Sequence, residues 1–234
     1  MVPVLNEAAN IEPLVTEIAD ALAAMHPFEL IYVDDASQDD TFSVIRSVAA
    51  AHKWVRAYKH DRTCGQSAAQ RTAILRARAP VIVTMDGDGQ NDPADVVALV
   101  EALEARAPDS RLAMVAGERQ RREDSLAKRL SSRIANRVRR ALLSDGSRDI
   151  GCGLKAFDRA AYLELPYFDH IHRFYPALIR REGYEVNYVD VGHRRRWKGS
   201  SKYGLFDRLG VGIVDLAGTF WLTRRRRLTR ISEL

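Results

Sequence analysis

The sequence predicts an α/β fold in which a mostly parallel central sheet is flanked by helices and followed by an amphipathic C-terminal tail. Short apolar runs alternate with segments of helical periodicity through the first half of the chain. Polar residues gather directly after these apolar runs, and arginine and lysine concentrate in the second half. Such alternation is typical of a parallel sheet whose connections are helical crossovers.

The predicted strands are short apolar segments, and most are followed by apolar residues at helical spacing. Between the first two strands, Ile11, Leu14 and Ile18 fall on one helical face. Gly65 and Pro93 mark the starts of two later helices. We expect strands at residues 2–5, 30–33, 55–58, 81–85, 112–115 and 185–191, and a helix at 170–181.

The stretch 81–93 contains the most informative motif. Its apolar strand, predicted to be buried on both faces, ends on Asp86, Asp88 and Gln90 at alternate positions. These residues therefore fall at the carboxyl end of a strand, where open α/β sheets bind ligands. Two carboxylates this close repel each other unless a cation lies between them, and oxygen ligands suit Mg²⁺ or Mn²⁺ together with substrate phosphates. The alternative is an acidic turn that caps the next helix.

Polar residues also follow the other predicted strands. Asn6-Glu7, Asp34-Asp35 and Glu118-Arg119 each come directly after an apolar run. Because these loops would open on the same edge of the sheet, their convergence predicts a site more strongly than any one motif does. No Gly-x-Gly-x-x-Gly follows the first strand, and this excludes a dinucleotide-binding dehydrogenase.

Composition indicates a chain of 234 residues that can build a full core, since 46% of its residues are hydrophobic. The two cysteines, Cys64 and Cys152, suggest no disulfide framework and fit a reducing compartment. The net charge of +5 comes with basic clusters that indicate phosphate-bearing partners. Binding of nucleic acid is disfavoured because the acidic strand-end loops would repel a polyanion.

The second half of the chain has two segments of basic, amphipathic character. Residues 124–143 have apolar positions spaced by four among arginines, as in a helix on a membrane surface or polyanion, or an ordinary solvated surface helix. The tail, residues 204–223, is interrupted by Asp207, Arg208 and Asp215 and is not a convincing membrane span. An interfacial helix with a polybasic end is expected there, and a helix packed on the domain or a partner is the alternative. The first strand is short, so we expect the gene product to begin a few residues earlier, and no signal peptide is recognised.

Five motifs in order resemble those of a family 2 glycosyltransferase of the GT-A fold, similar to the dolichyl-phosphate mannosyltransferase group. The motifs are Pro3-x-x-Asn6-Glu7-x-x-Asn10, Val33-Asp34-Asp35-x-Ser37-x-Asp39-x-Thr41, Asp86-x-Asp88-x-Gln90, Gly117-x-Arg119 and Arg196-x-x-Gly199-x-Ser201-Lys202. The resemblance covers nearly the whole chain. It implies a catalytic domain at residues 1–203 and a membrane-associating tail at 204–234.

The resemblance also implies roles for individual residues. Asp86, Asp88 and Gln90 are expected to hold the metal, with Asp88, Arg119 and Asp149 as catalytic residues. The segment His172-Arg173-Phe174 departs from the family pattern and is kept as an acceptor-pocket element. The nucleotide-sugar site would comprise Pro3, Glu7, Val33, Asp35, Asp86, Gly87, Arg119, Arg196, Lys198 and Lys202.

The implied reaction is a metal-dependent, inverting transfer of a sugar from a UDP- or GDP-linked donor. A polyprenyl phosphate is the expected acceptor, because a phosphate monoester is already ionised near neutral pH and needs cations rather than a general base. A glycan or lipopolysaccharide hydroxyl is the alternative, with Asp149 or Glu182 as base. The expected location is cytoplasmic and peripheral on the inner face of the membrane, with a membrane subunit or homo-oligomer as a further expectation.

Overall fold

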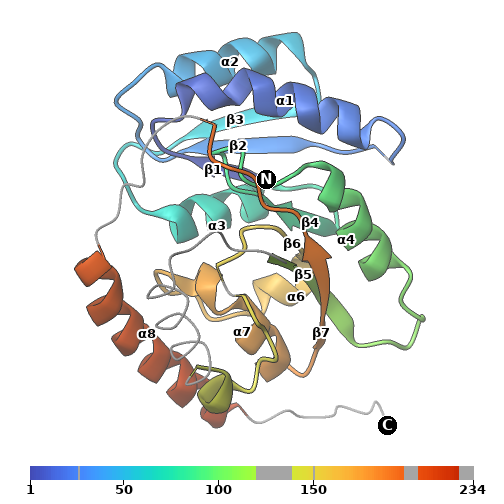
Figure 1. The fold of residues 1–234 in the computed structure, drawn as a ribbon, viewed down its shortest axis with the longest axis vertical. Helices are drawn as coiled ribbons and strands as arrows, with labels where there is room; N and C mark the ends of the chain where they lie inside the picture. Colours follow the sequence, from blue (N-terminus) through green and yellow to red (C-terminus); the bar gives the residue numbers. More distant parts are fainter. Residues whose placement is uncertain (26, 120–138, 150, 198–204, 227–234) are drawn as a thin grey trace, which may run out of the picture.

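The computed structural model describes residues 1–25, 27–119, 139–149, 151–197 and 205–226, and the side chains of the last segment from residue 212 on. Its first half alternates strands and helices as predicted (Figure 1). These elements are β1 (Val2–Val4), α1 (Ala8–Leu22), β2 (Leu30–Asp34), α2 (Thr41–Ala51), β3 (Val55–Lys59), α3 (Gln66–Arg76), β4 (Val81–Thr84), α4 (Ala94–Glu104) and β5 (Leu112–Arg119).

The second half adds β6 (Lys155–Asp158), α6 (Arg159–Leu163), the 3₁₀ turn η1 (Ile171–Arg173), α7 (Tyr175–Arg181), β7 (Glu185–Val191) and α8 (Leu205–Arg225). Strand β6 and helix α6 are absent from the sequence-based prediction. The helix expected at 170–181 divides into η1 and α7, because His170 adopts a left-handed conformation and Phe174 is non-helical. The basic helix predicted at 124–143 lies largely outside the described residues, which show its end, residues 139–143, as helical.

The strands form two ladders, β1-β2-β3 and β4-β6-β5-β7. The pairs β1–β2, β2–β3 and β5–β7 are parallel, whereas β6 runs antiparallel to both of its neighbours. Met1 links the two ladders, because its ammonium donates to the Val83 carbonyl and its own carbonyl accepts from the Met85 N–H. The carboxyl ends of β1, β2, β4 and β5 therefore point the same way, as the sequence predicted.

Alternation along β2 explains how helices cover both faces of the first ladder. Leu30 and Tyr32 pack into the core on the side of α1, α2 and α4, whereas Ile31 and Val33 pack against Ala69 and Ala73 of α3. A second core lies around β5, β6, α6 and α7. In Figure 1, α1 and α2 lie together on the outer side of β1–β3, and α8 runs along the outside of α7.

Helix α8 has a packed side and an exposed side. Leu216 and Phe220 contact the second core, and Arg181 of α7 donates to the Leu222 carbonyl at 3.0 Å. Ile213, Val214 and Trp221 are 68%, 70% and 56% exposed. Among the described helices, none is both long enough and apolar enough to cross a membrane.

Candidate active site at the carboxyl edge of the sheet

The loop after β4 places Asp86 and Asp88 side by side at the sheet edge. The Asp86 N–H donates to Asn91 Oδ1 at 3.0 Å, and Gln66 Nε2 donates to Asp86 Oδ1 at 3.0 Å. The Asp86 carboxyl lies against Gly153, where an added Cβ would come within 2.2 Å of Oδ2. Burial and the charge of Asp88 raise the pKa of Asp86. A cation bound between the two carboxylates would offset both the burial of the Asp86 charge and its repulsion by Asp88.

Arg196 bridges two predicted site carboxylates that come from different loops. Its guanidinium contacts Asp88 Oδ2 at 2.7 Å and Glu7 Oε1 at 3.1 Å. Glu7 also accepts from Asn10 Nδ2 at 2.5 Å, which fixes its carboxylate at the start of α1. The loops after β1 and β4 and the segment after β7 are thus brought together.

Gln90, the third predicted metal ligand, points its side-chain amide toward the segment after β7. Its Nε2 lies 3.4 Å from His193 Nε2 and donates to the Arg194 carbonyl at 3.4 Å. The intervening Gly89 has φ +76°, and a Cβ there would come within 2.3 Å of the Trp197 ring. Only glycine fits this tight turn beneath the indole.

Asp35 is a buried carboxylate held by three donors. It accepts from the backbone N–H groups of Cys64 at 2.9 Å and Gly65 at 2.7 Å, and His60 Nδ1 lies 2.7 Å from Oδ1. Pro3 of β1 pairs in register with Val33 of β2, which is fully buried. The predicted nucleotide-binding residues of the first two strands therefore lie at one place, and Gly87 is buried in the neighbouring loop.

Arg119 and Asp149 form a buried, bidentate ion pair. Nε lies 2.5 Å from Oδ2 and the NH2 nitrogen lies 2.8 Å from Oδ1. Burial opposes the charge of Arg119, but the hydrogen bonds and charge of Asp149 outweigh it, so the pKa of Arg119 is raised. Arg119 ends β5 and Asp86 follows β4, so both lie at the carboxyl edge of the sheet, and the positive charge of Arg119 opposes the rise in the pKa of Asp86.

Three site residues went unnoticed in the sequence because no motif marks them. Gln66 follows the helix-opening Gly65 and binds Asp86. Lys155 is buried in β6, and its ammonium donates to the Cys152 carbonyl. Burial lowers the pKa of Lys155, although the charges of Cys152, Asp86 and Asp149 oppose this. Ser67 Oγ lies 2.7 Å from His172 Nδ1, so the predicted acceptor element contacts the start of α3.

Two predicted phosphate-binding lysines cannot be compared with the structure, and the alternative general base lies in an ion-pair cluster. Lys198 and Lys202 lie outside the described residues. Glu182, the alternative base, is buried at the end of α7, where Arg181 and Arg226 both contact its carboxylate.

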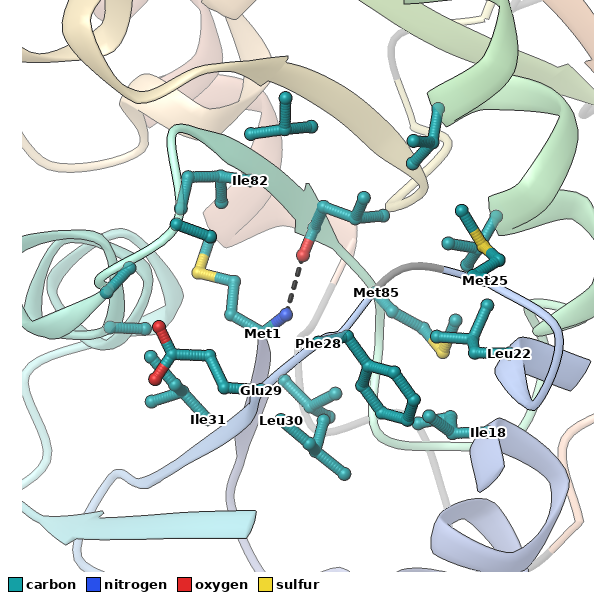
Figure 2. A pocket seen from close by; sticks show the side chains of 18 of the residues that line it. Met1, Ile18, Leu22, Met25, Phe28, Glu29, Leu30, Ile31, Ile82 and Met85 are labelled. Atoms are coloured by element: carbon teal, nitrogen blue, oxygen red, sulfur yellow. Dashed lines mark hydrogen bonds between the residues drawn. The ribbon is translucent and has the colours of Figure 1, made fainter. Parts of the chain in front are cut away.

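The structure also has an apolar cavity of about 290 Å³ (Figure 2). Its lining comes from the beginnings of β1, β2 and β4 and from α1 and α4, and includes Met1, Leu22, Phe28 and Ile82. The Met1 ammonium reaches the Val83 carbonyl there at 2.6 Å, and burial lowers its pKa to about 5. This cavity contains none of the predicted site residues.

Curated relatives resemble this chain over almost its whole length. It is 34% identical over 229 residues to a dodecaprenyl-phosphate galacturonate synthase of Rhizobium johnstonii, covering 96% of this chain and 66% of that protein. It is 28% identical over 237 residues to an undecaprenyl-phosphate 4-deoxy-4-formamido-L-arabinose transferase of Aeromonas hydrophila, covering 100% of this chain and 71% of that protein. The chain thus spans about two thirds of the length of these relatives.

Solved structures share the fold at lower identity. A glucosyl-3-phosphoglycerate synthase of Mycobacterium tuberculosis with Mn²⁺, UDP and phosphoglyceric acid superposes with a TM-score of 0.68 at 18% identity, covering 97% of this chain and 78% of that one. A mannosyltransferase of Pyrobaculum calidifontis with GDP-Man and Mn²⁺ superposes with a TM-score of 0.67 at 23% sequence identity, covering 98% of this chain and 64% of that one. The expected GT-A fold is confirmed. Residues 1–165 match glycosyl transferase family 2, and the chain belongs to that family.

Proposed function

We propose that this glycosyltransferase moves a sugar from a nucleoside diphosphate sugar to a polyprenyl phosphate, with inversion at the anomeric carbon. The observation that carries the proposal is the meeting of Asp86 and Asp88 with Arg119 and Arg196 at one sheet edge. Such an arrangement suits a diphosphate bound through a divalent cation. The names of the relatives, which specify dodecaprenyl and undecaprenyl phosphate, support the acceptor class.

Asp86 and Asp88 would hold the metal, because they supply only oxygen ligands and their mutual repulsion favours a cation between them. Gln90 is proposed as the third ligand, and its side chain would have to turn away from His193 to serve. Mg²⁺ or Mn²⁺ bound there would act as the Lewis acid that stabilises the leaving diphosphate. The presence of Mn²⁺ in the related solved structures supports this assignment.

The donor nucleotide is proposed to lie over the first two strands. Pro3, Val33 and Asp35 would contact the base and ribose, with Glu7 and Gly87 beside them. Asp35 already has a fixed orientation from the two backbone N–H groups that it accepts. Arg196, Lys198 and Lys202 would contact the phosphates, which they match in charge. The donor would be UDP- or GDP-linked.

Asp149 is the residue whose contacts distinguish between the two classes of acceptor. Both of its oxygens accept from Arg119, and Oδ1 also accepts from the Gly151 N–H at 3.1 Å. A carboxylate whose two oxygens are already engaged in this way is poorly placed to take a proton from an acceptor hydroxyl, which favours an acceptor that is ionised before it binds. An acceptor phosphate oxygen would attack the anomeric carbon as the bond to the donor diphosphate breaks. Asp149 then positions Arg119, which binds phosphate.

A hydroxyl acceptor is the weaker candidate. It requires a general base, and Glu182 is held by two arginines at the end of α7. Reaction products would distinguish the two, since a polyprenyl-linked sugar partitions into organic solvent and a glycan product stays in water.

The exposed side of α8 is proposed to meet the inner face of the membrane. Ile213, Val214 and Trp221 project from it, and Arg224 and Arg225 follow at its end. Arg225 lies over the Trp221 ring at 5.4 Å, so apolar and cationic groups are adjacent. Such a face suits an anionic lipid surface. Association with a membrane subunit or with a second copy stays a prediction, to be measured by light scattering in detergent.

The direct test uses purified protein, radiolabelled UDP- and GDP-sugars, and undecaprenyl phosphate in detergent. We expect label to enter the organic phase with Mn²⁺ or Mg²⁺ and to stay in water with EDTA. An Asp88→Asn variant that transfers sugar at the wild-type rate would exclude the metal assignment. Transfer to a water-soluble glycan and not to the lipid would exclude the acceptor.

A further inference from the structure

The segment of residues 193–197, which follows β7, lies directly on the metal loop. The Arg194 N–H donates to the Gln90 carbonyl at 3.0 Å, and the Trp197 N–H donates to the Asp88 carbonyl at 3.3 Å. The side chains of Gln90 and Asp88 face the same segment, through His193 and Arg196 respectively. Two of the three proposed metal ligands are thus engaged by one short stretch of chain.

Arg196 occupies the electrostatic position that a cation would take. Its guanidinium lies between Asp88 and Glu7, whose side chains are each only 10% exposed. Two carboxylates at this depth need a positive charge nearby, and the planar guanidinium satisfies both at once. A divalent ion bound to Asp88 would compete for the same Oδ2 and would repel the guanidinium.

The segment is fastened on its outer side as well. Arg194 contacts both oxygens of Glu17 on α1, at 3.2 and 2.7 Å, and donates to the Asn91 carbonyl at 3.0 Å. The Arg194 guanidinium also lies over the Trp197 ring at 5.3 Å, and that ring covers Gly89. The contacts of Arg196 therefore belong to an ordered arrangement built from α1, the metal loop and the segment.

We propose that Arg196 is a displaceable occupant of the metal site, which makes binding of the metal and of the donor diphosphate mutually dependent. Without donor, Arg196 holds Asp88 and opposes the metal. When the diphosphate arrives, it offers Arg196 a better anionic contact, so that Asp88 becomes available to the ion. This inference depends on the proposed metal and donor site and adds a coupling between its two ligands.

The coupling predicts opposite effects of one substitution on two affinities. Arg196→Ala should bind Mn²⁺ alone about 3- to 10-fold more tightly than wild type, because the competing cation is gone. The same variant should bind UDP or GDP in the presence of Mn²⁺ at least about 10-fold more weakly, because a diphosphate contact is lost. A residue that only stabilised the loop would weaken both.

The experiment measures free Mn²⁺ by electron paramagnetic resonance during titration of the full chain, with and without UDP or GDP. Arg195→Ala is the matched control, since it removes the same charge from an exposed neighbouring position and should change the affinity for Mn²⁺ alone less than about twofold. Arg196→Lys keeps the positive charge but loses the planar guanidinium that contacts two carboxylates at once. Its affinity for Mn²⁺ alone should therefore fall between those of wild type and Arg196→Ala. Thermal midpoints confirm that each variant is folded.

The outcomes separate the inference from the proposed function. If Arg196→Ala and Arg196→Lys bind Mn²⁺ alone no better than wild type, while wild type binds Mn²⁺ with nucleotide, the displacement is overturned and the site stands. If wild type binds no nucleoside diphosphate with Mn²⁺ present, the proposed donor site itself fails. If Arg195→Ala binds Mn²⁺ alone as much more tightly as Arg196→Ala does, the effect comes from removing any nearby positive charge, and the inference is also overturned.

Discussion

Two carboxylates on the β1–β4 side of the site, Asp35 and Asp86, are held differently from two that lie on the β5–β7 side. Asp35 accepts from two backbone N–H groups, and Asp86 accepts from the Gln66 amide. On the other side, Asp149 pairs with Arg119, and Asp145 pairs with Arg139. The first group is oriented mainly by neutral donors, whereas the second group is neutralised by arginine.

This difference separates two tasks. Neutral donors fix a carboxylate without cancelling its charge, so Asp86 stays available to a cation that arrives with the substrate. A buried ion pair fixes an arginine in a chosen direction at a cost in desolvation, and losing one member exposes that cost. Substitutions of Asp35 and Asp86 should therefore affect activity more than stability, and substitution of Asp149 should affect both.

The largest effect is expected from Asp86→Asn. Sugar transfer should fall by more than about 100-fold, because the metal loses a ligand. The thermal midpoint in EDTA should rise at neutral pH. The pKa of Asp86 is raised in the folded state by burial and by Asp88, so its ionised form destabilises the fold above the ordinary carboxyl pKa.

Differential scanning calorimetry and the extraction assay measure both quantities on one preparation. Asp61→Asn, which alters an exposed carboxylate, is the matched control and should leave both unchanged. A lower midpoint for Asp86→Asn would show that Asp86 stabilises the fold and would contradict the comparison above.

On the other side, Asp149→Asn should cost stability as well as rate. It leaves the Arg119 guanidinium, which is 13% exposed, without its carboxylate, and losing one member of a buried pair costs about 3 kcal/mol. By contrast, Asp35→Asn should cost about 1 kcal/mol, since the amide oxygen still accepts from one of the two backbone N–H groups and only the other loses its acceptor. Urea denaturation of both variants checks the ranking. Equal losses would mean that the two sides are not held differently.

The fold of the first side could be predicted because its signals are local. Apolar runs ended on Asp35 and Asp86, and the helices between them showed clear periodicity. Strand β6 escaped prediction because it is short, begins with the buried Lys155 and is defined only by pairing with β4 and β5. Arg119 and Asp149 were each recognised as site residues, but their pairing spans 30 positions, and no local pattern encodes it.

Gln66 shows the same limit within the site. Its position after Gly65 identified a helix start, whereas its contact with Asp86 depends on how α3 packs on β1 and β2 and so reaches the loop after β4. The competing contacts of Arg196 were likewise outside sequence reasoning, which assigned that residue to phosphate alone.

A smaller effect, and one that depends on pH, is expected at the junction of the two sides. His172 is bound to Ser67, and burial, with the nearby charges of Arg173, Lys155 and His170, lowers its pKa from 6.5 to about 3. Between these two pKa values, His172 stays neutral in the folded protein but takes up a proton in the unfolded chain. The free energy of unfolding should decrease by about 2 kcal/mol between about pH 7 and pH 5 because of this residue.

Urea titrations at the two pH values measure that decrease, and His172→Gln should remove it. His52→Gln, at an exposed position of the first side, should retain it. A pH dependence that is the same in wild type and His172→Gln would assign the acid sensitivity to other groups.

The smallest effect is expected on α8, where one face contacts the second core and the other is exposed. Ile213→Ser should leave the thermal midpoint unchanged, because that side chain is 68% exposed and contributes little to the packing of the core. Binding to vesicles with anionic lipid should weaken roughly 3- to 10-fold, as one apolar side chain fails to enter the interface. Ile213→Leu should bind like wild type. Vesicle sedimentation measures the change, and equal binding by Ile213→Ser would mean that this face of α8 does not meet lipid.

Sugar transfer links this face to the acceptor. A variant that binds vesicles more weakly should transfer less sugar to undecaprenyl phosphate in vesicles, while its transfer in detergent stays at the wild-type rate. Such a result would connect the exposed face of α8 to delivery of the acceptor rather than to chemistry at Asp86.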